Sequence, residues 1–190
     1  MSGRDNPISV RSKRRITDSL LELMKEQPFA KISIKDIVDR AGLTRQTFYH
    51  NFTSKEEVLL HREEELCDAF FAYLKEHPMK NWEDFIWFYF RYWQTNAEFV
   101  QLLIDNELVY VLNMQYPKYM ERVDELLSFS SLELPPQEQK YYYSFVSGAV
   151  VSILVSWVGS GMVTPAREMA TLVIHILTGS VGYPDLREMG

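Results

Sequence analysis

The chain has 190 residues, of which 46% are hydrophobic, which is enough for a substantial core and excludes a disordered protein. Its single cysteine, Cys67, excludes an internal disulfide and a cysteine-based zinc site, and no apolar run follows the charged N-terminus, so we expect a cytoplasmic protein. The net charge of -6 is uneven: residues 1–62 hold twelve Lys and Arg against eight Asp and Glu, whereas residues 63–190 hold eight against eighteen. This asymmetry predicts a polyanion contact confined to the first sixty residues.

Apolar residues recur at helical spacing along the whole chain, and no strand pattern lasts. The fold is therefore predicted to be all-α with about nine helices. Capping residues and prolines set their ends. The predicted helices cover residues 9–26, 34–41, 44–51, 54–77, 81–95, 97–114, 117–130, 136–160 and 165–178.

The second and third helices are joined by the short stretch "AGL". Ser33 and Asp36 form a variant of the capping box at the start of the second helix. Gly42 stands where a helix commonly ends in a left-handed residue. Together with the first helix, these two make a three-helix unit with a helix-turn-helix at residues 34–51.

The third helix carries polar side chains suited to the major groove. Phe48 and Phe52 are predicted inward anchors, so the outward residues are Arg45, Gln46, Thr47, Tyr49, His50 and Asn51. The helix is roughly 10 Å long at 1.5 Å per residue, which suits that groove. Arg and Gln can each make two hydrogen bonds to a base edge, and hydroxyl and amide groups can bind phosphates. Lys55 follows in the first turn of the next helix, where phosphate is favoured.

For a bare helix-turn-helix pattern, the alternative that Tyr49 and His50 are only surface residues of a helical hairpin has about equal weight. The whole run "SIKDIVDRAGLTRQTFYHNFTSKEEVL", however, closely resembles the DNA-binding domain of the TetR family of bacterial transcriptional regulators. The match includes "TFYHNF" and "SKEE", and it departs at Val38, where the family often has alanine.

The resemblance implies particular DNA contacts. Phosphate contacts are implied for Ser33, Lys35, Thr44, Thr47, Tyr49 and Lys55. Base contacts are implied for Arg45, Gln46 and His50. In the family the N-terminal segment can add phosphate contacts, and "RSKRR" from Arg11 to Arg15 has the charge to do so.

The rest of the chain resembles the family in its helical layout and in "WVGSGMVTPAREMATLV", which looks like the C-terminal end of many TetR-type sequences from Gram-positive bacteria. This implies a DNA-binding domain over residues 1–60 and an effector-binding and dimerisation domain over residues 61–190. The long helix 54–77 would link them. In this fold the C-terminal domain forms a homodimer and commonly encloses an effector.

The segment "WEDFIWFYFRYW", residues 82–93, holds eight aromatic residues in twelve. They fall on more than one face, so this helix should be buried on most sides. Core packing is one interpretation, and a pocket for an apolar or aromatic effector is the other. The predicted pocket lies between this helix and the one carrying Trp157, and its candidate residues are Trp82, Phe85, Tyr89, Trp93, Tyr110 and Trp157.

Residues 141–166 are all uncharged, which meets the length of a membrane span. Five serines and three glycines among them count against a span. Every fourth position from Ser144 to Ser160 is serine or glycine, and such a row lets another helix approach closely. We therefore expect a homodimer interface rather than a membrane, with candidate residues Gly148, Ser152, Ser156, Met169, Val173 and Ile176.

The four histidines have no carboxylate or cysteine partner at ligand spacing, and there is no glycine-rich phosphate loop. The sequence thus predicts no catalytic residue, no metal site and no cofactor. It predicts a homodimeric repressor that binds a palindromic double-stranded DNA operator and is released by a small apolar or aromatic effector. The alternatives are a partner-controlled activator whose C-terminal domain binds a protein, and a membrane-tethered regulator.

Overall fold

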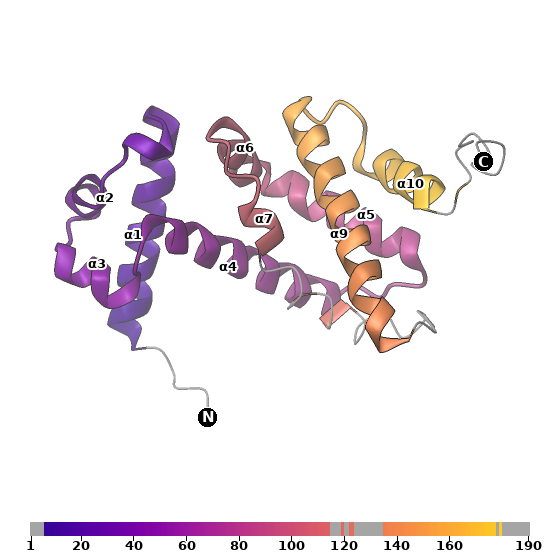
Figure 1. Cartoon of the computed structure of the whole chain (residues 1–190), viewed down its shortest axis with the longest axis horizontal. Coiled ribbons are helices and arrows are strands. Elements are labelled where there is room, and N and C mark those ends of the chain that lie inside the picture. Colours follow the sequence, from indigo (N-terminus) through magenta and orange to yellow (C-terminus); the bar gives the residue numbers. More distant parts are fainter. Residues whose placement is uncertain (1–5, 115–118, 120–121, 124–134, 178, 180–190) are drawn as a thin grey trace. The chain divides into compact units, whose positions relative to one another are not determined.

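The computed structural model describes residues 6–114, 119, 122–123, 135–177 and 179. Over these residues all regular structure is helical, which confirms the all-α prediction (Figure 1). The predicted helix 117–130 falls mostly outside the described residues. The helices are α1 (Pro7–Glu26), η1 (Phe29–Lys31), α2 (Ile34–Ala41), α3 (Arg45–Asn51), α4 (Lys55–Lys75), α5 (Trp82–Thr95), α6 (Ala97–Asp105), α7 (Val111–Met114), α9 (Pro136–Gly159) and α10 (Ala166–Leu177).

Packing divides the chain into two compact units. The first comprises Met1–Asp68 and Glu98–Gln115, and the second comprises Ala69–Ala97 and Tyr116–Gly190. The first unit therefore includes α7 and nearly all of α6 as well as α1 to α3, although α6 and α7 come later in the chain. The functional boundary expected at residue 60 stays a prediction.

In the first unit, α1, α2 and α3 pack on one another (Figure 1). Their shared core includes Ile16 and Leu20 of α1, Ile37 of α2 and Phe48 of α3, all with side chains fully shielded from solvent. Burying a side chain of this size stabilises the fold by roughly 1.5–3 kcal/mol. Phe48 and Phe52 are both buried anchors, as predicted.

The predicted helix over residues 97–114 is wrong, because α6 ends at Asp105. Glu107 follows in the left-handed conformation with φ of 59°, and the N–H of Leu108 donates to the carbonyl of Leu103 at 2.8 Å. This arrangement commonly ends helices, but glycine usually holds the left-handed position. A glutamate there gave the sequence pattern no stop signal.

In the second unit, α5 packs against α10 and α9. The core between these helices contains Phe90 of α5, Leu154 of α9, and Ala170 and Val173 of α10, each at most 1% exposed. The aromatic α5 is thus buried on several sides, as its sequence predicts.

Candidate DNA interface

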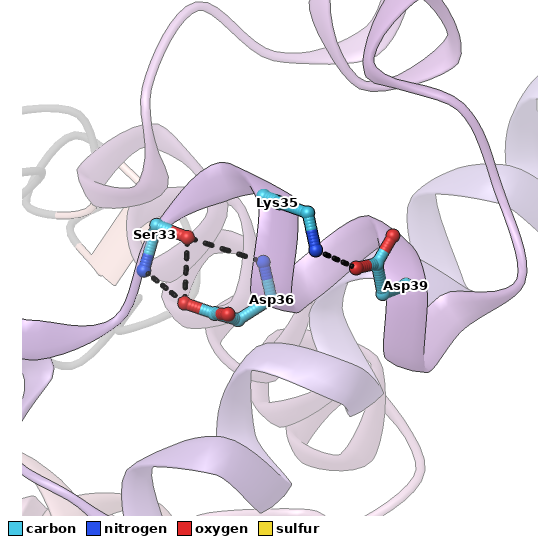
Figure 2. A network of polar contacts seen from close by, with 4 residues as sticks. All are labelled: Ser33, Lys35, Asp36 and Asp39. Carbon is cyan, nitrogen blue, oxygen red and sulfur yellow. Dashed lines mark hydrogen bonds and ion pairs between the residues drawn. The ribbon is translucent and has the colours of Figure 1, made fainter.

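A capping box fixes the start of α2, the first helix of the helix-turn-helix. The Asp36 N–H donates to Ser33 Oγ at 3.2 Å, and the Ser33 N–H donates to Asp36 Oδ2 at 2.9 Å (Figure 2). The Ser33 hydroxyl also donates to Asp36 Oδ2, at 2.6 Å. The Ser33 hydroxyl and N–H hold the pKa of Asp36 below its ordinary value, because they stabilise the carboxylate. The side chains of Ser33 and Asp36 therefore fix the first turn of α2.

Lys35 directly precedes Asp36 and forms an ion pair with Asp39 at 2.7 Å (Figure 2). Hydrogen bonding to Asp39 raises the pKa of Lys35 above its ordinary value. Both side chains are more than half exposed, so the pair is held weakly. The Lys35 ammonium can leave Asp39 for another anion at little expense in stability.

The turn between α2 and α3 favours glycine at position 42 because of its backbone conformation. Gly42 has φ of 60°, the left-handed region that disfavours other residues. A β-carbon on Gly42 would lie 2.9 Å from the Arg15 guanidinium of α1, but that flexible side chain can move aside. Val38, where the family resemblance departs, is 3% exposed and its carbonyl accepts from the Leu43 N–H.

Helix α3 is held by one buried ring and presents polar groups around it. Thr44 is its N-cap, and the Thr44 hydroxyl accepts from the Thr47 N–H at 3.1 Å. Phe48 is 0% exposed. The exposed side chains of this helix are Arg45, Gln46, Tyr49 and His50, and Thr47 is half-buried. Most of the base-reading and phosphate-binding residues implied by the sequence are thus available on one short helix.

Asn51, another predicted DNA contact, is engaged inside the unit. Its Oδ1 accepts from the Ser9 hydroxyl at 2.7 Å, and its Nδ2 donates to the Thr47 carbonyl at 2.7 Å. Asn51 therefore ties the end of α3 to the start of α1. Its part in DNA contact stays a prediction.

Lys55 is likewise bound within the unit. Its ammonium donates to the carbonyls of Phe29 and Ile32 at 2.6 and 2.9 Å. The Phe29 N–H in turn donates to Asn106 Oδ1 at 2.6 Å. Sequence reasoning missed Phe29 and Asn106, because they are 77 positions apart and no local pattern joins them.

The basic segment "RSKRR" belongs to α1 rather than to an extended arm, since α1 begins at Pro7. Arg11, Arg14 and Arg15 are exposed on this helix. Arg14 lies 3.8 Å from Asp18 in a loose surface pair. These charges remain candidates for phosphate contacts.

The predicted effector residues do not all fall in one unit. Tyr110 belongs to the first unit and is 48% exposed, whereas the other five belong to the second. Of these, Phe85, Trp93 and Trp157 are buried. Trp157 Nε1 donates to the Thr164 carbonyl at 2.7 Å.

Phe90, which the sequence reasoning left out, packs edge-on against Trp157 with 5.3 Å between ring centroids. Phe70 of α4 contacts Phe85, Tyr89 and Tyr92 of α5. The aromatic residues therefore pack largely on one another, as the core interpretation predicts. Whether an effector also binds among them stays a prediction.

The predicted interface residues divide by helix. Gly148, Ser152 and Ser156 of α9 are exposed. Met169 and Val173 of α10 are 6% and 0% exposed, so the chain itself covers them and a partner would not reach them. Ile176 is half-buried. On α10 the exposed apolar side chains are instead Leu172 and Leu177.

One described helix, Gln137–Gly159, is long and apolar enough to cross a membrane. A single helix of this kind is weak evidence, because core helices of soluble proteins meet the same criterion. Among the described residues, no group of three or more His, Cys, Asp or Glu is placed to hold a metal ion.

Two family models match the chain. Residues 16–61 match the bacterial regulatory proteins of the tetR family, and residues 80–179 match a transcriptional regulator C-terminal region. The chain belongs to the TetR family of transcriptional regulators. TetR family regulators bind DNA and act as dimers. The predicted helix-turn-helix regulator is thereby confirmed.

Relatives within the family are distant. The chain is 23% identical over 180 residues to the uncharacterised HTH-type regulator YxbF of Bacillus subtilis, covering 88% of this chain and 45% of YxbF. It is 50% identical over 38 residues to the HTH-type regulator EthR of Mycobacterium tuberculosis, covering 20% of this chain and 18% of EthR. The chain thus spans less than half the length of these curated relatives.

Solved structures share the TetR fold over nearly the whole chain. Lin0861 of Listeria innocua is 15% identical with a TM-score of 0.75, and the match covers 94% of this chain and 95% of Lin0861. The fatty acid degradation regulator FadR of Bacillus halodurans is 17% identical with a TM-score of 0.65, covering 95% of this chain and 100% of FadR. At these identities the likeness concerns the fold alone.

Proposed function

We propose that this TetR family protein is a homodimeric repressor that binds a palindromic operator through α3 and is released by a small apolar or aromatic effector. The observation that carries the DNA half is the division of α3 into one fully buried ring, Phe48, and a set of exposed polar side chains. A helix held in this way can enter the major groove without disturbing its own core.

Particular contacts follow from the chemistry of α3. Arg45 and Gln46 lie in its first turn and carry the two side chains best suited to paired hydrogen bonds with guanine and adenine. Thr47, Tyr49 and His50 supply further donors to phosphates and bases. Lys35 adds a phosphate contact, because its surface pair with Asp39 is easily exchanged.

The homodimer is supported by the uncovered face of α9. Tyr141 and Phe145 are 68% and 67% exposed, and the same face continues through Gly148 and Ser152. A β-carbon added to Gly148 would meet nothing within 4 Å in this chain. Glycine inside a helix lowers stability by about 1 kcal/mol relative to alanine. A second copy of α9 packed against this face would explain a glycine that the single chain does not need.

The proposed effector site is apolar. In the aromatic segment Arg91 is exposed, Asp84 accepts from the Lys80 N–H at 2.9 Å, and Glu83 accepts from the Thr171 hydroxyl at 3.3 Å. An effector beside Trp157 would have to separate it from Phe90. Such an aromatic pair contributes roughly 0.5–1.5 kcal/mol, which ligand binding can offset.

Release requires that α5 act on the DNA-binding unit. A single residue separates the end of α5 at Thr95 from the start of α6 at Ala97, so a displacement of α5 is passed along the chain to α6. In the first unit Glu98 of α6 forms an ion pair with Lys25 of α1 at 2.6 Å. Effector binding would thereby favour a dimer in which the two α3 helices no longer match successive major grooves.

The test has two stages. Selection from a random DNA pool should yield a palindrome, because a two-fold dimer reads two equal half-sites. A thermal-shift screen of apolar and aromatic compounds should then find ligands that stabilise the protein, by about 2.7 kcal/mol at a hundredfold excess over the dissociation constant. Those ligands should lower operator affinity. A selected site without symmetry contradicts the dimer, and stabilising ligands that leave operator affinity unchanged contradict release.

A further inference from the structure

The short helix η1 connects α1 to the helix-turn-helix. Its C-cap residue, Ile32, directly precedes Ser33, which is the N-cap of α2. Three residues make one turn, and a turn this short has little stability of its own. The position of α2 therefore depends on what holds η1 in place.

Lys55, at the start of α4, holds η1 through the backbone carbonyls of that turn. Its ammonium donates to Phe29 and Ile32 at 2.6 and 2.9 Å and lies 4.2 Å from the centroid of the Phe29 ring. An ammonium has three donors, and two of them are used here. The charge is further stabilised by the ring face. If the Lys55 side chain swung away toward a phosphate, it would lose both hydrogen bonds and the ring contact.

Asn106, at the end of α6, holds the same turn through the backbone N–H of Phe29. Its Oδ1 accepts from the Phe29 N–H at 2.6 Å, and its Nδ2 donates to the Leu102 carbonyl at 2.9 Å. The second hydrogen bond fixes the orientation of the amide. Both backbone polar groups of Phe29 are thus bound by side chains, one 26 and the other 77 positions away.

We infer that Lys55 and Asn106 are positioning residues, which clamp Phe29 from both sides and so set where α2 and α3 stand for specific DNA binding. In this role the Lys55 charge is used inside the protein and not on a DNA phosphate. The inference rests on the proposed operator binding by α3. In this arrangement the backbone of one buried residue, Phe29, aligns the start of α2, the start of α4 and the end of α6 with one another.

Salt dependence distinguishes a clamp from a phosphate contact. Removing a lysine that binds phosphate lowers the slope of log affinity against log salt by about 0.9 for every DNA sequence. Removing a clamp misplaces the base-reading side chains instead, so specific affinity falls while non-specific binding and its slope stay. The ratio of specific to non-specific affinity is the decisive quantity, since a role in stability alone would not change it in folded protein.

The experiment uses the full chain and the operator selected by the wild type. Lys55→Met and Asn106→Ala should each lower the specific to non-specific ratio roughly tenfold, the size expected for losing one set of base contacts, with the non-specific salt slope unchanged. Asn106→Ala removes no charge, so it also serves if Lys55→Met does not fold. Circular dichroism should confirm that each variant is folded at the assay temperature.

Two control variants match these changes. Lys31→Met removes one exposed charge from the same η1 turn. Asn96→Ala removes an asparagine that donates to the Tyr92 carbonyl at 3.0 Å at the end of α5, as Asn106 does at the end of α6. Both controls should keep the wild-type ratio.

A non-specific slope lowered by about 0.9 in Lys55→Met, with an unchanged ratio, would overturn the inference in favour of a phosphate contact. Wild-type ratios in both variants would overturn it as well, and a loss confined to Lys55→Met would overturn the part assigned to Asn106. If the wild type itself selects no operator, the proposed function fails instead, which separates the two failures.

Discussion

Helices α3 and α9 both leave a face uncovered in the single chain, but the two faces differ in chemistry. On α3 the exposed residues are polar or charged, and even its exposed aromatic, Tyr49, carries a hydroxyl. On α9 the exposed face joins the aromatic Tyr141 and Phe145 to the small Gly148 and Ser152. Both faces carry hydroxyl groups, but only the α3 face also has a guanidinium, a carboxamide and an imidazole, whereas residues 141–160 include no charged side chain.

The contrast shows how an uncovered face indicates its partner. Hydrogen-bonding side chains on a helix suit base edges and phosphates, which have many donors and acceptors. Small side chains beside aromatic ones suit another helix, which needs close approach and apolar area. The charge distribution agrees with this assignment of partners, because residues 1–62 are net positive and the remainder of the chain is net negative.

The largest expected effect comes from removing the anchor of the polar face. Phe48→Ala should lower the free energy of unfolding of the first unit by about 3–5 kcal/mol and abolish specific DNA binding, because a fully buried ring leaves a cavity. Denaturant unfolding measures the loss of stability, and an operator-binding assay measures the loss of specific DNA affinity. Dimerisation should persist in sedimentation, since α9 belongs to the second unit.

Tyr49→Phe is the matched control for that change. Tyr49 is 59% exposed and lies edge-on to Phe48, so losing its hydroxyl should change stability by less than about 0.5 kcal/mol. It should still weaken DNA binding if that hydroxyl contacts phosphate. Loss of the dimer in Phe48→Ala would contradict the independence of the two faces.

The next effect concerns the apolar face. Gly148→Leu or Ser152→Leu should weaken the dimer by about 1–3 kcal/mol, because the added side chain separates closely packed helices. Sedimentation over a range of concentrations measures this. Gln94→Leu adds the same side chain to an exposed position of α5 and should leave the dimer unchanged. A dimer that tolerates both α9 changes excludes this face as the interface.

Gly148→Ala sharpens the same point. Within one chain the added methyl has open space, so helix propensity should stabilise the fold by roughly 0.5–1 kcal/mol. In a dimer closely packed at Gly148 the methyl should instead oppose association. Stability and dimer affinity that rise together would contradict the proposed contact.

Sequence alone predicted most of the polar region, because its signals are local. The capping pair Ser33 and Asp36, the left-handed Gly42 and the buried Phe48 each depend on neighbours within a few residues. The Phe29–Asn106 contact depends on residues far apart in the chain, and no periodic pattern reports it.

The packing of α5, α9 and α10 was harder to predict. An apolar stripe in the sequence shows that one face of a helix is covered, but it does not show which neighbour covers that face. The stripe of α10 was correctly apolar, yet Met169 and Val173 turn inward to α5 and not outward to a second chain. Likewise the aromatic spacing of α5 did not single out Phe90, which packs on Trp157. Which face meets which neighbour is decided by tertiary packing.

A smaller effect on DNA binding is expected from a single base-reading side chain. Arg45→Ala should relax specificity at one position of each half-site and lower operator affinity by about 1–3 kcal/mol. Arg45→Lys keeps the charge but loses the two-pronged geometry, so it should relax the same position with a nearly unchanged salt slope. Selection from a pool randomised within the half-site measures both. Equal loss of specific and non-specific affinity in Arg45→Ala would show that Arg45 contacts only the backbone.

A further effect of modest size concerns the start of α2, which is capped by side chains, whereas α9 begins at Pro136 with no side-chain cap. Ser33→Ala should lower the free energy of unfolding at pH 7 by about 1 kcal/mol, the usual loss for an N-cap. The pKa of Asp36 is depressed by Ser33, so the part of this stabilisation due to the carboxylate is complete above the ordinary value near 3.9 and is lost as pH falls through the depressed value. The difference between wild type and Ser33→Ala should therefore shrink below about pH 4. Urea unfolding from pH 7 to pH 2.5 measures it, and in an Asp36→Asn background the difference should no longer vary with pH. A difference that grows in acid would mean that the Ser33 cap does not favour the charged carboxylate.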